Sequence, residues 1–240
     1  MLNDQSLIER HVEALYTIDS AGQLVSVREP NGAPAPRFFL SRSASTLVYR
    51  FRFDVPPSAR RELGAAATGV PLGALRGDGT NEAREELARL AAILARSAPV
   101  TNMTAGPAYA FPNELPSFAA DDGMIVHVTE ANIGLLDPLL RAWVPDVYHS
   151  PPLIALTLHG RAVAVCASVR ITANAHEAGV ETVPAHRSRG YAARVVSAWA
   201  ERVRALGAEP LYSTSWENAP SRSVARKLAL VHFGNDVHLT

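Results

Sequence analysis

The stretch HRSRGYAAR, residues 186–194, places two arginines and a glycine directly before a segment with helical periodicity. In residues 191–206 apolar side chains recur at the spacing of one helix face, at Ala192, Val195, Val196, Trp199, Val203 and Leu206. The first amides of such a helix have no carbonyl partner within it. Because the helix dipole adds about half a positive charge at that end, the pattern predicts a site for an anion such as phosphate.

Three residues at the start of this helix bear on that prediction. Gly190 has no Cβ and lets the backbone come close to an anion, and Arg187 and Arg189 add mobile positive charge at the rim. A glycine that only makes a turn, beside two solvated arginines, would explain the same residues. The elements on either side decide between these two interpretations.

The segments around residues 186–194 alternate between strand and helix patterns. In chain order we expect a strand MIVHV, a helix EANIGLLDPLLRAW, strands PLIALTL and AVAVCASVRI around the turn HGR, and a strand AGVETV. After the helix of residues 191–206, which Gly207 ends, we expect a strand PLYSTS, a helix PSRSVARKLAL and short closing segments VHFG and DVHLT. This order predicts a mixed sheet with helices packed against it.

The N-terminal part of the chain has a different pattern. LYTID and LVSVRE flank the turn SAGQ, RFFLSR and TLVYRFRF flank SAS, and two helical segments follow, PPSARRELGAAATG and NEAREELARLAAILARS. A connection rich in Pro, Gly and Asn follows at residues 98–123. We therefore expect an N-terminal α+β domain with its linker over residues 1–115 and a second domain over residues 116–240.

Composition limits the classes of function. Of the 240 residues, 48% are hydrophobic and 19% charged, which is typical of a globular protein. Lys and Arg number 23 and Asp and Glu number 23, so we expect no broad cationic face for nucleic acid. The N-terminus lacks the pattern of a secretory signal, and no apolar run is long enough to span a membrane. Because Cys166 is the single cysteine and the histidines lack ligand spacing, we expect a cytoplasmic protein without disulfide, metal or membrane partner.

Residues 187–192, RSRGYA, match the pattern R/Q-x-x-G-x-G/A. This is the acyl-coenzyme A signature of the Gcn5-related N-acetyltransferase (GNAT) family, which the chain resembles over residues 122–240. The stretch SWENAPSRSVARKLAL is similar to the family's later segment, in which Asn precedes a helix. Motifs of dinucleotide and P-loop sites do not occur. The resemblance implies an α/β (α+β) fold with a GNAT-like mixed, largely antiparallel sheet flanked by helices, and the smaller α+β domain expected from the N-terminal pattern would precede it.

The resemblance also implies a site for acetyl-coenzyme A. In the family the motif strand and the next parallel strand splay apart, and pantetheine lies in the opening. Here backbone groups of Thr182 and Val183 would bind pantetheine, and the pyrophosphate would be held at Arg187, Ser188, Arg189, Gly190, Tyr191, Ala192 and Ala193. Asn218 and Ser221 would contact the cofactor from the other side, although Asn218 would equally serve as a helix cap.

Transfer of an acyl group to an amine needs a base that removes the ammonium proton. Glu177 and Glu181 on the motif strand are the candidates, and alternation keeps them on one face unless a bulge intervenes. Glu181 lies nearer the expected thioester and is preferred. Both carboxylates would equally be explained as solvated or salt-bridged residues of a half-exposed strand.

One residue departs from the family pattern. Many members have a tyrosine in the last helix that protonates the leaving thiolate, and the matching position here is Ala225. Tyr212 and Tyr191 are the candidates to replace it, although both positions are typical of packing residues.

The expected function is acetyl transfer from acetyl-coenzyme A to a primary amine of a small molecule or peptide, by direct attack on the thioester. The N-terminal domain would then cover the acceptor side or support a homodimer. The missing tyrosine keeps a second function open, that of a non-catalytic module that binds coenzyme A or acyl-coenzyme A.

Overall fold

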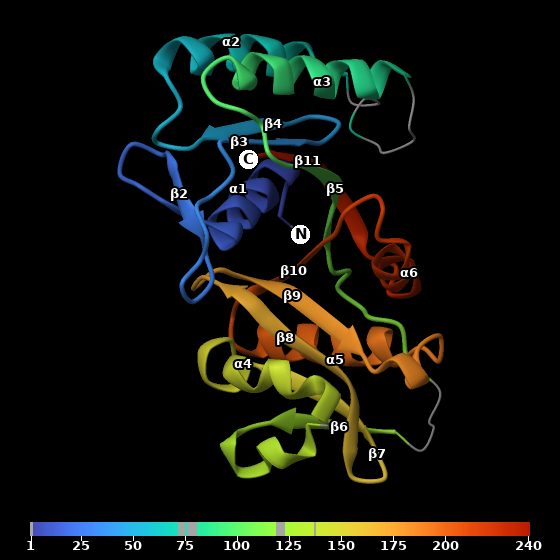
Figure 1. The fold of residues 1–240 in the computed structure, drawn as a ribbon. Coiled ribbons are helices and arrows are strands. Elements are labelled where there is room, and N and C mark those ends of the chain that lie inside the picture. The colour runs from blue at the N-terminus through green and yellow to red at the C-terminus, as the bar shows by residue number, and fades with distance from the viewer. Residues whose placement is uncertain (1, 72–74, 76–80, 119–122, 137) are drawn as a thin grey trace. The chain divides into compact units, whose positions relative to one another are not determined.

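The structure is a computed structural model that describes residues 2–71, 75, 81–118, 123–136 and 138–240. The chain forms two compact units (Figure 1). The first contains Met1–Tyr109, Ser213–Ala219 and His232–Thr240, and the second contains Ala110–Tyr212 and Pro220–Val231. The chain therefore leaves the first unit twice, after Tyr109 and after Ala219, and returns to it twice.

The elements of the first unit include the four predicted strands and two predicted helices. In chain order they are α1 (Asp4–Leu15), β1 (Tyr16–Ile18), β2 (Leu24–Val27), β3 (Phe38–Arg42), β4 (Leu47–Phe51), α2 (Pro57–Gly69), α3 (Asn81–Ala95), β5 (Met103–Ala110) and β11 (Val231–Leu239). Helix α1 was not among the predicted elements. The Asn3 side chain caps it by accepting from the amide of Ser6 at 2.9 Å, and its inner face buries Leu7, Ile8 and Val12.

The sheet of the first unit has the strand order β4-β3-β11-β5. β3 pairs antiparallel with β4 and with β11, so that Phe38 lies opposite Phe51 on one side and Leu239 on the other. Figure 1 shows α2 and α3 on one side of β3 and β4, and α1 on the other. A core of apolar side chains fills the space between the strands and α2 and α3, including Phe38, Leu63, Leu90, Leu94 and Leu239.

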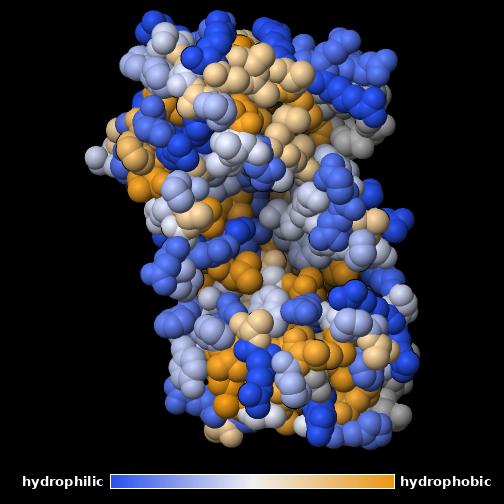
Figure 2. Space-filling model, viewed as in Figure 1, coloured by the Kyte–Doolittle hydropathy of each residue, from blue (hydrophilic) through white to orange (hydrophobic). Residues whose placement is uncertain are grey.

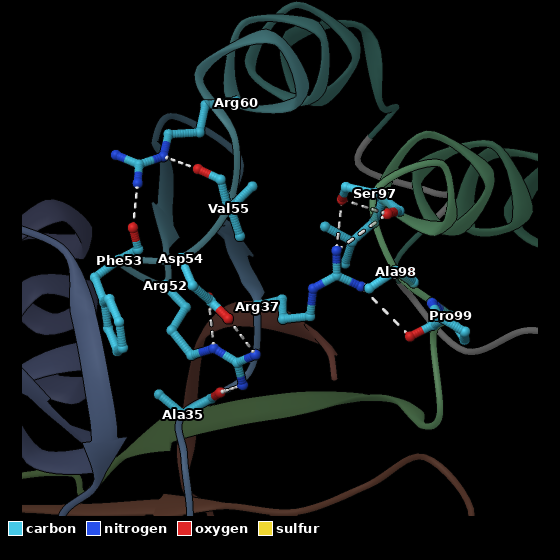
Figure 3. Close-up of polar contacts among 11 residues, drawn as sticks. Ala35, Arg37, Arg52, Phe53, Asp54, Val55, Arg60, Ser97, Ala98 and Pro99 are labelled. Atoms are coloured by element: carbon cyan, nitrogen blue, oxygen red, sulfur yellow. Dashed lines mark hydrogen bonds and ion pairs between the residues drawn. The ribbon is translucent and has the colours of Figure 1, made fainter.

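One buried arginine closes the end of α3. The guanidinium of Arg37 donates to the carbonyl oxygens of Leu94 (3.2 Å) and Ala98 (2.7 Å) and to the hydroxyl of Ser97 (2.6 Å), as Figure 3 shows for the last two. The Leu94 carbonyl also accepts from the amide of Ser97 at 3.2 Å, so the arginine adds to the hydrogen bonds at the end of α3 and joins the start of β3 to the segment after this helix. Burial lowers the pKa of Arg37, whereas the charge of Asp54 acts in the opposite direction.

The second unit carries the elements around the predicted anion site. They are β6 (Met124–Val128), η2 (Glu130–Leu135), η3 (Pro138–Trp143), α4 (Val144–His149), β7 (Leu153–Leu158), β8 (Arg161–Ile171), β9 (Ala175–Thr182), η4 (Pro184–His186), α5 (Tyr191–Ala205), β10 (Glu209–Ser213) and α6 (Ala219–Lys227). The strand order is β10-β9-β8-β7-β6. β9 and β10 are parallel, whereas β6 to β9 are antiparallel neighbours. The predicted mixed, largely antiparallel sheet flanked by helices is therefore confirmed.

Helices cover both faces of this sheet. Figure 1 shows α5 on one side of β8 and β9, and α4 on the other. The stripe on α5 is buried as predicted at Val195, Val196, Trp199 and Val203, whereas Leu206 beyond it is exposed. Gly207 follows α5 with φ of 83°, a left-handed conformation that glycine adopts without steric cost.

The segment EANIGLLDPLLRAW does not form the single helix that the sequence analysis predicts. It contains two short 3-10 helices, η2 and η3. Asn132 has a non-helical φ of −129°, and Pro138 has no amide hydrogen to donate to a preceding turn. The surface of the second unit near α4 and β6 is mixed: Figure 2 shows hydrophobic residues among hydrophilic ones there. Two apolar side chains of this part of the chain are largely exposed, Met124 of β6 (67%) and Leu139 of η3 (64%).

The two closing segments predicted at VHFG and DVHLT form one strand, β11. Most of this strand, from His232 on, belongs to the first unit because it pairs with β3. The compact units therefore differ from the two consecutive domains, 1–115 and 116–240, that the sequence analysis expects. In the part of the chain that the structure describes, no helix is both long and apolar enough to cross a membrane.

Candidate active site

The parallel strands β9 and β10 are paired over only part of their length. Their register runs from Glu209 opposite Ala175 to Leu211 opposite Glu177. β9 continues beyond this point to Thr182, and over residues 178–182 its ladder is formed with β8. In the second half of β9, one edge is therefore paired with β8. The other edge lies past the last residue pair that β9 forms with β10.

The backbone groups on that edge can be assigned from one hydrogen bond. The amide of Val183 donates to the carbonyl oxygen of Val163 at 2.9 Å, so it points toward the β8 side. Because alternate residues of a strand direct their backbone groups to opposite sides, those of Val180 and Thr182 face away from β8. The carbonyl of Val183 also has a partner, the amide of His186 at 2.8 Å. Of the two predicted pantetheine residues, Thr182 has its backbone on the opening and Val183 does not, because both of its backbone groups are used within the chain.

The loop after β9 leads into α5 through two left-handed residues. Ser188 has φ of 63° and Gly190, the N-cap of α5, has φ of 86°. No side chain caps this helix start, so the amides of Tyr191, Ala192 and Ala193 have no partner from a cap. A Cβ built on Gly190 meets no atom within 4 Å, so its surroundings are open. Backbone in such a conformation forms a concave group of N–H donors that suits an anion.

The charged side chains at the start of α5 are positive. Arg187, Ser188 and Arg189 are exposed, and the Nε of Arg187 donates to the carbonyl oxygen of Thr182 at 3.2 Å. The hydroxyl of Thr182 is buried and has no hydrogen-bond partner among the described residues. Two arginines, free amides and the helix dipole together favour a bound anion here.

The face of β9 that carries Glu177 and Glu181 is covered by the indole of Trp143, from the end of η3. Trp143 Nε1 donates to Glu181 Oε2 at 2.5 Å. Gly179 lies between the two glutamates on this face, and a Cβ there would overlap Val169 and lie 3.1 Å from the indole ring of Trp143. The absence of a side chain at Gly179 therefore allows the indole to reach Glu181.

The two candidate bases differ in burial. Glu177 is 2% exposed, whereas Glu181 is half-buried. The register between β8 and β9 shifts between Ser168 and Arg170, so the extra residue of this bulge is on β8. Alternation along β9 is not interrupted, and Glu177 and Glu181 share a face. Glu181 has access to solvent, and the Trp143 indole holds one of its carboxylate oxygens.

His176 faces the opposite side of β9, toward α5. Its Nδ1 lies 2.8 Å from Ser168 Oγ, which also accepts from Trp199 Nε1 at 3.0 Å. Burial lowers the pKa of His176. This hydrogen-bonded chain of three buried side chains joins the sheet to α5 and leaves His176 without a role at the Glu181 face.

The hydroxyl of Tyr212, at the end of β10, lies 2.6 Å from Ser221 Oγ on α6. Tyr212 and Ser221 are therefore brought together, one helical turn before Ala225, which is buried. Asn218 belongs to the first unit, where its amide donates to the carbonyl oxygen of Ser215 at 3.2 Å directly before α6. The contacts of Ser221 and Asn218 with a cofactor stay predictions.

Three residues of this site were missed by the sequence analysis: Trp143, Gly179 and Val180. A glycine inside a strand often marks the close approach of another group, so Gly179 was the signal that the sequence offered. Trp143 had no such signal, because its position depends on how two short helices pack on the sheet. In the described residues no group of three or more His, Cys, Asp or Glu is arranged to hold a metal ion.

Comparisons with known proteins agree with this geometry. The family model "FR47-like protein" matches residues 159–233, which include β8, β9, the loop and α5. No match is found among curated proteins.

Three solved structures are similar to this chain. A GCN5-related N-acetyltransferase from Kribbella flavida is 15% identical, with a TM-score of 0.50, and the match covers 98% of this chain and 93% of that one. A GNAT-family protein from Novosphingobium aromaticivorans is 22% identical, with a TM-score of 0.47, over 58% of this chain and 65% of that one, so the chain spans less than two thirds of its length. A tandem GNAT protein from the clavulanic acid biosynthesis pathway is 12% identical, with a TM-score of 0.44, over 99% and 97%.

The match with a TM-score of 0.50 extends over nearly the whole chain and shows the fold. The family model covers the strand, loop and helix that carry residues 187–192. The resemblance expected from those residues is therefore confirmed: residues 159–233 match the FR47-like family model, and the chain shares the fold of a solved GCN5-related N-acetyltransferase.

Proposed function

We propose that the protein is an acetyl-coenzyme A-dependent N-acetyltransferase that acts on a primary amine by direct attack on the thioester. The observation that carries this proposal is the free edge of β9 beyond Glu177, which leads directly to the uncapped start of α5. A single ligand with an amide-containing arm and a diphosphate would satisfy both features.

The residues present fit such a ligand. The backbone of Val180 and Thr182 faces the open edge and can pair with the amides of pantetheine, as a neighbouring strand would. The left-handed residues Ser188 and Gly190 and the first amides of α5 can hold the diphosphate, with Arg187 and Arg189 at its rim. Acetyl-coenzyme A supplies an activated acyl group when it is bound.

Glu181 is the residue that we assign to proton removal from the amine. Trp143 holds its Oε2, so the carboxylate has a fixed orientation and Oε1 is left to take a proton. Glu177 is 2% exposed and therefore too deeply buried to meet an amine from solvent. The acceptor is proposed to be a small molecule or a peptide.

The test is release of free thiol from acetyl-coenzyme A with a panel of primary amines. Glu181→Gln keeps an oxygen for the Trp143 indole but cannot take a proton, so turnover should fall by roughly 100-fold or more while calorimetry shows unchanged cofactor affinity. Glu177→Gln is the matched variant and should lower turnover far less. Equal loss in both variants, or no loss in either, would contradict the role of Glu181.

A second candidate function is that of a module that binds coenzyme A without turnover. It is favoured by one observation, the buried Ala225 at the position where the family's proton-donating tyrosine is expected. Cofactor binding without thiol release on any amine of the panel, in a protein where Glu181→Gln changes nothing, would support the module. Absence of coenzyme A binding would exclude both functions.

A further inference from the structure

A cleft in the first unit contains none of the residues of the candidate active site. Its volume is about 460 Å³, and it is lined by Asp4, Ser43, Tyr109, Trp216, His232 and Asn235, among others. These residues come from the start of α1, from the β3–β4 turn, from β5, from the segment after β10, and from β11. Five separate pieces of chain thus contribute to one hollow of a size suited to a small molecule.

The aromatic walls of this cleft are held in place by the protein. The backbone amide of Trp216 donates to the carbonyl oxygen of Ala105 at 3.0 Å, and its indole Nε1 donates to that of Leu75 at 3.0 Å. Tyr109 meets the ring of His232 edge-on, with 5.6 Å between the ring centroids. Side chains that are already ordered lose little freedom when a ligand binds, and aromatic faces attract cations.

The charge of the lining also selects a cation. Asp4 contributes a carboxylate to the lining, and no Lys or Arg lines the cleft within the described part of the chain. His232 Nε2 lies 2.8 Å from the amide oxygen of Asn235. Because that oxygen only accepts, Nε2 carries the hydrogen and the lone pair of Nδ1 is left as an acceptor. The carboxylate and this nitrogen are suited to an ammonium group, which has three donors.

A buried amide group supplies a second, independent sign of a ligand. Asn235 is fully buried, and its Nδ2 has no hydrogen-bond partner among the residues that the structure describes. Buried polar groups almost always have a partner, so an unpaired amide beside a cleft indicates an oxygen atom supplied by a bound molecule or an ordered water. An ammonium alone would not satisfy Nδ2, which donates and does not accept.

We propose that this cleft binds a protonated primary amine with an aromatic body and a hydroxyl or carbonyl oxygen. The ammonium group would lie at Asp4 and His232, the body would pack against Tyr109 and Trp216, and the oxygen would accept from Asn235. This assignment concerns binding by the first unit and does not depend on acyl transfer.

The probe for this site is 2-amino-1-phenylethanol, and its neutral match is 1-phenyl-1,2-ethanediol, in which a hydroxyl replaces the ammonium. Calorimetry on the whole protein at pH 7, without any acyl donor, should show one amine bound per chain at least ten-fold more tightly than the diol. Removal of the probe's hydroxyl, in 2-phenylethylamine, should weaken binding. Equal affinity for amine and diol would overturn the proposal.

Two variants locate the site. Asp4→Asn should remove the preference for the amine, whereas Glu82→Gln is the matched control, because Glu82 is an exposed carboxylate in the first turn of another helix. Ala44 is an exposed residue of the lining, so Ala44→Phe should fill the cleft and abolish binding of both compounds. Circular dichroism checks that each variant is folded. Amine binding that survives Asp4→Asn or Ala44→Phe would refute the assignment.

Discussion

Two glycines at opposite ends of α5 share one backbone conformation, but only one of them lies at a proposed ligand site. Gly190 at its start and Gly207 after its end have φ of 86° and 83°, and a Cβ on either meets no atom within 4 Å. Any side chain at either position therefore has the same steric cost in its own backbone, about 1–2 kcal/mol. Only Gly190 lies at the proposed diphosphate site.

This pair gives a controlled test of the anion site. Gly190→Ala should lower both the free energy of unfolding and the affinity for coenzyme A, the latter by about ten-fold, because a shift of φ turns the first amides of α5 away from the ligand. Gly207→Ala should lower only the free energy of unfolding. Calorimetry with coenzyme A and urea denaturation measure the two quantities. A similar affinity in both variants would show that the amides of α5 do not hold the diphosphate.

His176 predicts a pH dependence of stability. Burial lowers its pKa below the ordinary value of 6.5, so the folded chain binds fewer protons than the unfolded chain as the pH falls through that value. The stabilising contribution of the neutral ring is complete above pH 6.5 and is lost as the pH falls. Between pH 7.5 and pH 5.5 the wild-type protein should thus lose more of its free energy of unfolding than His176→Gln. Parallel urea titrations of both proteins measure this difference, and identical pH dependence would contradict it.

At the scale of elements, β9 depends on a residue that has no side chain. The indole of Trp143 lies against Gly179, and Val169 of β8 lies close on the same side. A methyl group at this position would displace the indole or the strand, and overpacking of this kind costs about 1–3 kcal/mol.

Gly179→Ala should therefore lower the free energy of unfolding and disturb the Trp143–Glu181 hydrogen bond. Trp143→Phe should remove the same hydrogen bond with a smaller loss of stability, because no overlap is created. Gly134→Ala, in η2, is a suitable control, since a Cβ at Gly134 meets no atom within 4 Å. Urea denaturation and turnover separate these effects, and wild-type stability in Gly179→Ala would show that the packing at Gly179 is loose.

The elements that were predicted correctly are those with a local signal. The stripe of α5 and the alternation of β3 and β4 are visible in a single window of sequence, and so is the motif at residues 187–192. The η2–η3 segment had a helical pattern, but Pro138 and the non-helical Asn132 break it. Trp143 and Val180 could not be assigned, because their role at the site follows from pairing between strands and from packing, which no local pattern contains.

At the scale of the whole molecule, the two units have separate cores. Leu239 of β11 is fully buried with Phe38 and Leu63 in the first unit, and Leu153 of β7 is buried with Leu140 and Val165 in the second. The domain boundary expected near residue 115 could not reveal that the C-terminal strand belongs to the first of these cores, since pairing of β11 with β3 joins residues far apart in the sequence.

Leu239→Ala and Leu153→Ala are matched substitutions in the two cores. Each should cost about 2–5 kcal/mol because it leaves a cavity. Hydrogen exchange should show lost protection at β3 and β4 in the first variant and at β7 and β8 in the second. If either substitution lowered protection equally across both sets of strands, the units would unfold as one, contrary to their separate cores.

The late position of β11 in the chain has a consequence for biosynthesis. During translation β3 emerges early, but the partner on one of its sides is made only when residues 232–240 leave the ribosome. Until then the apolar stretch Phe38–Leu40 belongs to a strand with an open edge, the kind of surface that nascent chains join in error. The sheet around β3 is thus complete only after the whole second unit has been synthesised, although β3 itself is made long before.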